Sequence, residues 1–100
     1  MGLLFLAAAI SPPLGHVYTD PDFGGECTPL YEMCNTLPSG MARNISSYNL
    51  AYRNLSCTFY DTYCDDTKGG LWTDNGLAES KELQGIRKNV TSVLCQRYTI

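Results

Sequence analysis

Two cysteine pairs with the same spacing constrain this chain more than any other feature. Cys27 and Cys34 are separated by six residues, as are Cys57 and Cys64, and a threonine follows the first cysteine of each pair. A chain of 100 residues buries too small a share of its unfolded surface for its core alone to give more than marginal stability. The repeat therefore predicts one small domain that depends on disulfides.

Cys95 is the fifth cysteine, so the thiols cannot all pair within one chain. Either each repeated unit closes its own short loop, or the two units are cross-linked to each other. Longer loops restrict the unfolded chain more, which favours cross-linked units with Cys95 in a bridge. The alternative pairs Cys27, Cys34, Cys57 and Cys64 with one another and leaves Cys95 unpaired, in a disulfide-linked dimer or in a fragment that lacks a sixth cysteine. If Cys95 is paired, Cys27 is the preferred odd thiol.

An apolar run at residues 3–10 has the length of a signal-peptide core and is too short to span a bilayer. We interpret residues 1–15 as a signal peptide and residues 16–100 as a single secreted, cysteine-rich domain. Cleavage after Gly15 is preferred to cleavage after Ser11. No later segment is apolar enough to cross a membrane, so no stable membrane insertion is expected.

A second repeat also points to secretion. A cation, an asparagine, an aliphatic residue and a hydroxyl residue occur in that order three times. Each copy contains the acceptor pattern for N-glycosylation, with Asn44, Asn54 and Asn89 as the acceptors. Three such patterns beside five cysteines are typical of a protein made in an oxidising compartment. We therefore expect a secreted, extracellular glycoprotein.

The first part of the chain predicts loops followed by a hairpin. Residues 16–26 are rich in Asp, Pro and Gly and are expected to form an extended arm or loop. Residues 27–34 are expected to form a short loop or a helical turn. Apolar side chains alternate over residues 47–52 and again, after a change of phase, over residues 55–60. This period of two predicts two strands joined as an antiparallel hairpin.

The remaining residues predict one helix and a last strand. Residues 77–88 are the best helix candidate, with Asp74 or Asn75 as the cap and cations in the last turn. Residues 90–100 should form a terminal strand with Cys95 facing inward. The buried stripe of the helix would consist of Leu83, Ile86 and Val90. The expected fold class is a small disulfide-stapled α+β domain, a short antiparallel sheet with one helix across it.

Charge and residue types exclude several function classes. The formal net charge is -3 and the cations are scattered, so neither nucleic acid nor an anionic membrane is expected as a partner. His16 is the only histidine and no C-x-x-C pair occurs, so neither a catalytic centre nor a zinc site is expected. Asp61, Asp65 and Asp66 are interpreted as a solvated turn rather than a calcium site. We expect no enzyme activity, no metal and no cofactor.

Four tyrosines, Tyr48, Tyr52, Tyr60 and Tyr63, gather on the expected hairpin. They either pack the core or form a candidate binding surface, since tyrosine offers a large contact area. The sequence favours a secreted binding protein, an effector or inhibitor that acts on an extracellular protein partner. A secreted toxin or antimicrobial polypeptide is the alternative, and a small hydrolase is less favoured.

Overall fold

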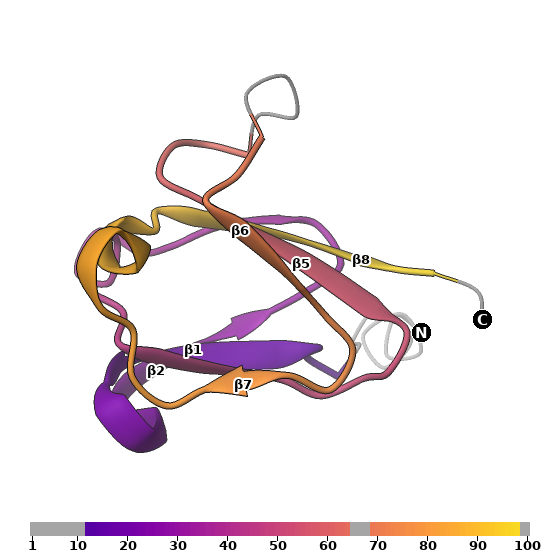
Figure 1. The fold of residues 1–100 in the computed structure, drawn as a ribbon, viewed down its shortest axis with the longest axis horizontal. Helices are drawn as coiled ribbons and strands as arrows, with labels where there is room; N and C mark the ends of the chain where they lie inside the picture. Colours follow the sequence, from indigo (N-terminus) through magenta and orange to yellow (C-terminus); the bar gives the residue numbers. More distant parts are fainter. Residues whose placement is uncertain (1–11, 65–68, 99–100) are drawn as a thin grey trace, which may run out of the picture.

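The structure, a computed structural model, describes residues 12–64 and 69–98, so residues 1–11 of the predicted signal peptide lie outside it. The described residues form two four-stranded antiparallel sheets that face each other (Figure 1). Sheet A has the strand order β2-β1-β4-β7, and sheet B has the order β3-β8-β5-β6. The strands are β1 (Gly15–Asp20), β2 (Gly24–Leu30), β3 (Cys34–Thr36), β4 (Ser47–Leu50), β5 (Leu55–Tyr60), β6 (Trp72–Asn75), β7 (Glu79–Ser80) and β8 (Ser92–Arg97). Two short 3-10 helices, η1 (Pro21–Phe23) and η2 (Gly85–Asn89), lie in the connections.

The two sheets repeat one arrangement. The order β2-β1-β4 in sheet A corresponds, strand for strand, to the order β6-β5-β8 in sheet B. The third strand of each half crosses over, so β3 completes sheet B and β7 completes sheet A. The register follows the same repeat, because Tyr18 pairs with Ser47 in sheet A and Tyr60 pairs with Ser92 in sheet B. The fold is therefore an internal duplication in which the halves exchange a strand.

The core fills the space between the sheets. Side chains alternate along a strand, so every second residue can face inward. Val17 and Tyr48 are register partners in sheet A, Phe59 and Val93 are register partners in sheet B, and all four are buried. The other buried apolar residues are Leu14, Leu30, Leu37, Met41, Ile45, Leu50, Leu55, Cys57, Tyr60, Leu83, Val90 and Cys95.

The predicted α+β class is wrong, because residues 12–64 and 69–98 are nearly all antiparallel sheet and contain no α-helix. Residues 77–88, predicted as the helix, contain β7 and most of η2. Gly85 has φ of 64°, a left-handed conformation that a right-handed helix does not tolerate. Leu83 and Val90 are buried as predicted, but from irregular backbone. The side chain of Ile86 lies outside the described part.

Strands do form within residues 47–52 and 55–60, but the predicted hairpin between them is wrong. β4 pairs with β1 and β7 in sheet A, while β5 pairs with β6 and β8 in sheet B. The change of phase at Arg53 and Asn54 marks the passage of the chain from one sheet to the other.

The segments predicted as loops carry more regular structure than expected. Residues 16–26 lie in β1, η1 and the start of β2, and residues 27–34 contain the end of β2 and a turn into β3. Asp74 and Asn75, predicted as helix caps, lie in β6 instead. Residues 90–100 do contain a strand, β8, as predicted.

A buried serine shapes the connection between β1 and β2. Asp22 and Phe23 both have positive φ, 56° and 62°, which L-residues rarely adopt. Ser47 on β4 holds this turn, because its Oγ donates to the carbonyl of Asp20 at 2.7 Å and accepts from the N–H of Phe23 at 2.9 Å. The turn that the sequence predicts as part of an extended arm or loop is therefore hydrogen-bonded to β4, an inner strand of sheet A.

Candidate functional site

Both disulfides hold sheet B. Cys34 is joined to Cys64, one cysteine from each repeated unit. Cys57 is joined to Cys95, its register partner on β8, and both side chains are fully buried. Cys27 has no disulfide partner in residues 12–64 and 69–98, and it is exposed on β2, an edge strand of sheet A. The odd thiol is therefore Cys27, and the alternative in which Cys27 is paired and Cys95 is left over is wrong.

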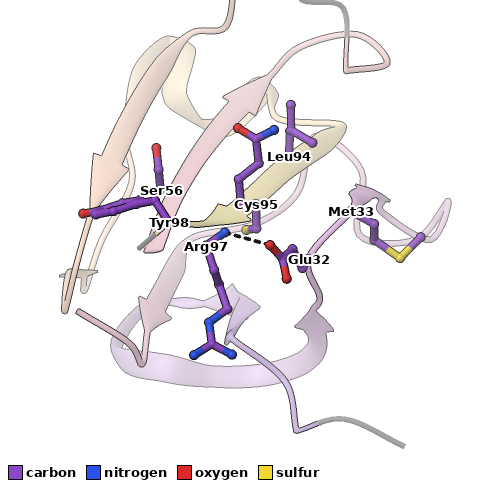
Figure 2. Close-up of a pocket in the computed structure, with 8 residues that line it drawn as sticks. Glu32, Met33, Ser56, Leu94, Cys95, Arg97 and Tyr98 are labelled. Carbon is purple, nitrogen blue, oxygen red and sulfur yellow. Dashed lines mark hydrogen bonds between the residues drawn. The ribbon is translucent and has the colours of Figure 1, made fainter. Parts of the chain in front are cut away.

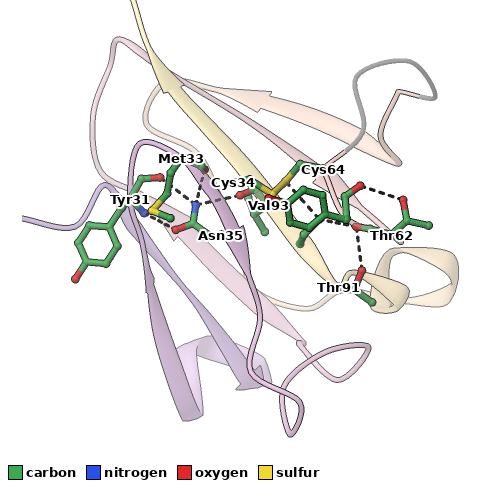
Figure 3. Close-up of a disulfide and its surroundings, with 10 residues drawn as sticks. Tyr31, Met33, Cys34, Asn35, Thr62, Cys64, Thr91 and Val93 are labelled. Atoms are coloured by element: carbon green, nitrogen blue, oxygen red, sulfur yellow. Dashed lines mark hydrogen bonds between the residues drawn. A yellow bond between two sulfur atoms is a disulfide. The ribbon is translucent and has the colours of Figure 1, made fainter.

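A buried asparagine shapes the turn that precedes β3, as Figure 3 shows. The side-chain oxygen of Asn35 accepts from the N–H of Tyr31 at 2.9 Å. Its Nδ2 lies 3.0 Å from each of three carbonyl oxygens, those of Tyr31, Met33 and Val93. The amide therefore fixes the turn against β8. The exposed side chains of Tyr31 and Met33 are thereby held beside sheet B.

The predicted tyrosine surface does not form. Tyr48 and Tyr60 face the interior and are only 1% and 4% exposed, so the alternative of core packing describes these two. Tyr52 is half-buried and Tyr63 is exposed, and they lie in different connections. No common surface therefore joins the four side chains.

A pocket of about 420 Å³ opens along the end of β8, between β5 and the turn before β3. We call it the β8 pocket, and Figure 2 shows Met33 and Tyr98 on opposite sides of it. Met33 is 56% exposed and Tyr98 is 46% exposed. The residues that give it its chemical character are Glu32, Met33, Ser56, Leu94, Arg97 and Tyr98.

Contacts between distant segments fix the shape of the β8 pocket. The backbone N–H of Arg97 donates to the carboxylate of Glu32 at 3.0 Å, and the N–H of Cys95 donates to the carbonyl of Met33 at 3.2 Å. The guanidinium of Arg97 lies 4.8 Å from the centre of the Tyr52 ring, in a cation–π arrangement. These contacts therefore hold the walls of the β8 pocket in place without a bound partner.

The β8 pocket carries one methionine, one arginine and one tyrosine side chain. Methionine, tyrosine and arginine are enriched where proteins bind one another. Within residues 12–64 and 69–98, no three His, Cys, Asp or Glu side chains are grouped to hold a metal ion. His16 lies in β1 on the other sheet, and Asp61 is exposed. Asp65 and Asp66 lie outside the described residues.

Solved structures share this arrangement of strands. A βγ-crystallin domain from Flavobacterium johnsoniae matches with a TM-score of 0.65 and 18% identity, over 84% of this chain and 94% of that chain. This chain has the βγ-crystallin fold. The N-terminal domain of Protein S gives a TM-score of 0.63 at 18% identity, over 86% and 98% of the two chains. A βγ-crystallin domain from Clostridium beijerinckii gives 0.62 at 18% identity, over 83% and 97%.

No protein-family model and no curated protein matches this chain. The similarity to the solved domains is one of fold, and it replaces the predicted α+β class with the nearly all-β βγ-crystallin fold. The part of the chain that the structure describes also holds no helix long and apolar enough to cross a membrane.

A second hollow, of about 510 Å³, lies beside the free thiol. It follows the edge strand β2 of the βγ-crystallin fold and is lined by Glu26, Cys27, Thr28, Pro38, Gly40 and Met41. Cys27 therefore sits in a recess that is open to solvent rather than in the core.

The three predicted glycosylation sites differ in their position relative to the strands and in their exposure to solvent. Asn44 lies three residues before β4 and Asn89 three residues before β8, which are equivalent positions in the two halves of the βγ-crystallin fold. Both side chains are exposed. Asn54 lies immediately before β5 and is half-buried.

Sequence reasoning missed the β8 pocket because its parts are far apart in the chain. Glu32 and Arg97 are 65 residues apart, and only the βγ-crystallin fold brings them together. Arg97 and Tyr98 are the available signal, but the β-branched and aromatic content of residues 90–100 predicts only a strand.

Proposed function

We propose that this chain is a secreted, N-glycosylated binding protein, an effector or inhibitor that recognises an extracellular protein through the β8 pocket. The observation that carries the proposal is the exposure of Met33 and Tyr98 on either side of a preformed hollow that also contains Arg97. Apolar side chains exposed together on a small domain mark contact surfaces, and these residue types supply much of the energy at such contacts.

The disulfides support secretion and binding together. Such bonds persist in oxidising compartments and are rare in the cytosol. Cys34–Cys64 and Cys57–Cys95 both hold sheet B, the sheet that carries the β8 pocket. A rigid surface loses little conformational entropy on binding, so bridging this sheet favours affinity.

No observation favours the alternatives over this proposal. A membrane-active toxin needs a basic amphipathic surface, whereas the formal net charge here is -3 and the described part holds no amphipathic helix. A small hydrolase needs a nucleophile with a base, and the side chain of His16 makes no hydrogen bond within the described residues.

We also propose that a second copy of the chain can bind through Cys27. The thiol is exposed on β2, and β2 forms an edge of sheet A. Unpaired edges are the places where strands of another chain add. Exchange with a small disulfide of the oxidising compartment, which is reduced to two thiols, would join the Cys27 thiols of two copies. Both intrachain bridges and the β8 pocket would stay unchanged.

Binding of purified, secreted protein to a panel of extracellular proteins tests the main proposal. At least one partner should bind, and Met33→Asp should weaken that binding tenfold or more because it places a charge in the apolar contact. Tyr63→Ala is the matched control, since Tyr63 is 67% exposed but does not line the β8 pocket. Equal binding by Met33→Asp and the parent protein would rule out this pocket as the contact.

A further inference from the structure

The three acceptor asparagines lie at two ends of the molecule. Asn44 and Asn89 precede β4 and β8, whereas Asn54 lies beside the far end of β8. Figure 1 shows η2, which ends at Asn89, at the left and the end of β8 at the right. The backbone N–H of Arg43 donates to the carbonyl of Val90 at 2.8 Å, so the loops of Asn44 and Asn89 adjoin each other.

The side chain of Asn54 is hydrogen-bonded to another segment of the fold, and within the part of the chain that the structure describes the side chains of the other two acceptors are not. Its Nδ2 donates to the carbonyl of Tyr98 at 3.0 Å, and the N–H of Tyr98 donates to the carbonyl of Asn54 at 2.9 Å. These two bonds close the end of β8 onto the connection before β5. The side chains of Asn44 and Asn89 make no hydrogen bond within the described residues.

The hydroxyl residues of the same patterns show the opposite division. Ser46, two residues after Asn44, is buried, and its Oγ accepts from the ammonium of Lys88 at 2.7 Å. Thr91, two residues after Asn89, donates to the carbonyl of Thr62 at 3.1 Å. The hydroxyl of Ser56, by contrast, makes no hydrogen bond among the described residues. In the patterns of Asn44 and Asn89 the hydroxyl is hydrogen-bonded within the fold. In the pattern of Asn54 the asparagine side chain is hydrogen-bonded instead.

We propose that Asn44 and Asn89 carry the N-linked glycans of the secreted protein and that Asn54 is a structural residue that stays unmodified. The inference rests on the proposed passage through a secretory route. In the transfer, Nδ2 forms a bond to C1 of an oligosaccharide linked to a lipid diphosphate. The bond from C1 to the diphosphate oxygen breaks, the lipid diphosphate leaves with that electron pair, and the proton that Nδ2 loses passes to the leaving diphosphate. One hydrogen remains on Nδ2, so at Asn54 a glycan would replace one of the two hydrogens available for the bond to the carbonyl of Tyr98.

The position of the β8 pocket favours the same division. Tyr98 lines this pocket and is the hydrogen-bond partner of Asn54, so a glycan on Asn54 would lie over the proposed contact surface. Glycans on Asn44 and Asn89 extend from the other end of β4 and β8 and leave the pocket open.

Site mapping of the secreted protein tests the proposal. A glycosidase that converts each glycan-bearing asparagine to aspartate should convert Asn44 and Asn89 and leave Asn54 as asparagine. Conversion of Asn54 to the same extent as the others would overturn this inference and leave secretion intact. Conversion at none of the three sites would overturn the proposed glycosylated state, and this inference with it.

Matched variants separate the structural role from glycosylation. Compared after glycosidase treatment, Asn54→Gln should lower the melting temperature by about 4–8 °C, the shift expected when about one net hydrogen bond is lost from a domain of this size. Ser56→Ala removes the same acceptor pattern but should leave the melting temperature unchanged. At the first pattern the order reverses, so Ser46→Ala should lower it and Asn44→Gln should not. Equal melting temperatures for Asn54→Gln and Ser56→Ala would overturn the structural role.

Discussion

The hydroxyl of Tyr48 on β4 donates a hydrogen bond to the carboxylate of Asp74 on β6 and so joins sheet A to sheet B. The indole N–H of Trp72 donates to the same hydroxyl oxygen at 3.2 Å. Phe59 completes an aromatic cluster, with its ring centre 4.4 Å from that of Trp72 and 4.6 Å from that of Tyr48. The hydroxyl of one buried tyrosine thus forms hydrogen bonds with two side chains of the opposite sheet.

We predict that Tyr48→Phe lowers the free energy of unfolding by about 1–3 kcal/mol, because Asp74 and Trp72 lose the hydroxyl that they share. Urea denaturation followed by the fluorescence of Trp72, the only tryptophan, measures this change. Tyr63→Phe removes a hydroxyl from an exposed ring and should have no effect. An unchanged urea midpoint for Tyr48→Phe would mean that the bond between the sheets adds no net stability.

Replacing Cys57 and Cys95 together with alanine should lower the free energy of unfolding by roughly 4 kcal/mol in the loop-entropy model. The partners are 38 residues apart, so the bridge closes a long loop in the unfolded chain. Denaturant midpoints under non-reducing conditions check the prediction. Cys27→Ala, which breaks no bridge in the described chain, is the control and should retain the parent midpoint.

Cys27→Ser should convert any disulfide-linked dimer to monomer, because Cys27 is the free and exposed thiol of the described chain. Non-reducing electrophoresis and intact-mass measurement follow the conversion, and peptide mapping should find both remaining bridges intact. A parent protein that is wholly monomeric, with one thiol that reacts with a thiol reagent, would exclude the covalent dimer.

A mature chain that begins at Pro12 should be more stable than one that begins at His16 by about 2–4 kcal/mol. Leu14 is buried, its N–H donates to the carbonyl of Leu30 at 2.7 Å, and its carbonyl accepts from the N–H of Ala51 at 2.8 Å. Cleavage after Gly15 would remove all three contributions. We therefore expect a chain that begins at Pro12 to have a higher urea midpoint than one that begins at His16, and equal midpoints would contradict this.

Sequence alternation revealed strands but not their partners. Tyr48 and Phe59 both lie on strands that the period of two predicted, and both side chains reach the core. Their strands nevertheless belong to different sheets, because β1 lies beside β4 where the hairpin model placed β5. β1 is hard to recognise in the sequence, because Val17 is the only large apolar side chain that it buries. Its neighbours His16 and Tyr18 are both half-buried.

The false helix shows how local signals can be overruled. Glu79 and Glu82 precede Lys88 in the order that favours a helix dipole. Helix propensity is a weak preference, and tertiary pairing of Glu79 with Asn49 places this segment at the edge of sheet A. Gly85 then adopts a conformation that no right-handed helix accommodates. The β8 pocket and the disulfide pairing depend on such distant contacts, so spacing alone could not specify them.

The exchange of β3 and β7 makes the two halves mutually dependent. A fragment that ends between β4 and β5 would keep three strands of sheet A and carry β3 without a neighbour to pair with. Unfolding of either half removes a strand from the sheet of the other half. We therefore expect the domain to unfold in a single cooperative transition. The same exchange of strands allows a partly unfolded molecule to pair with the corresponding strand of another chain. Proteolytic cleavage between β4 and β5 should therefore produce strand-exchanged oligomers before it releases separate halves.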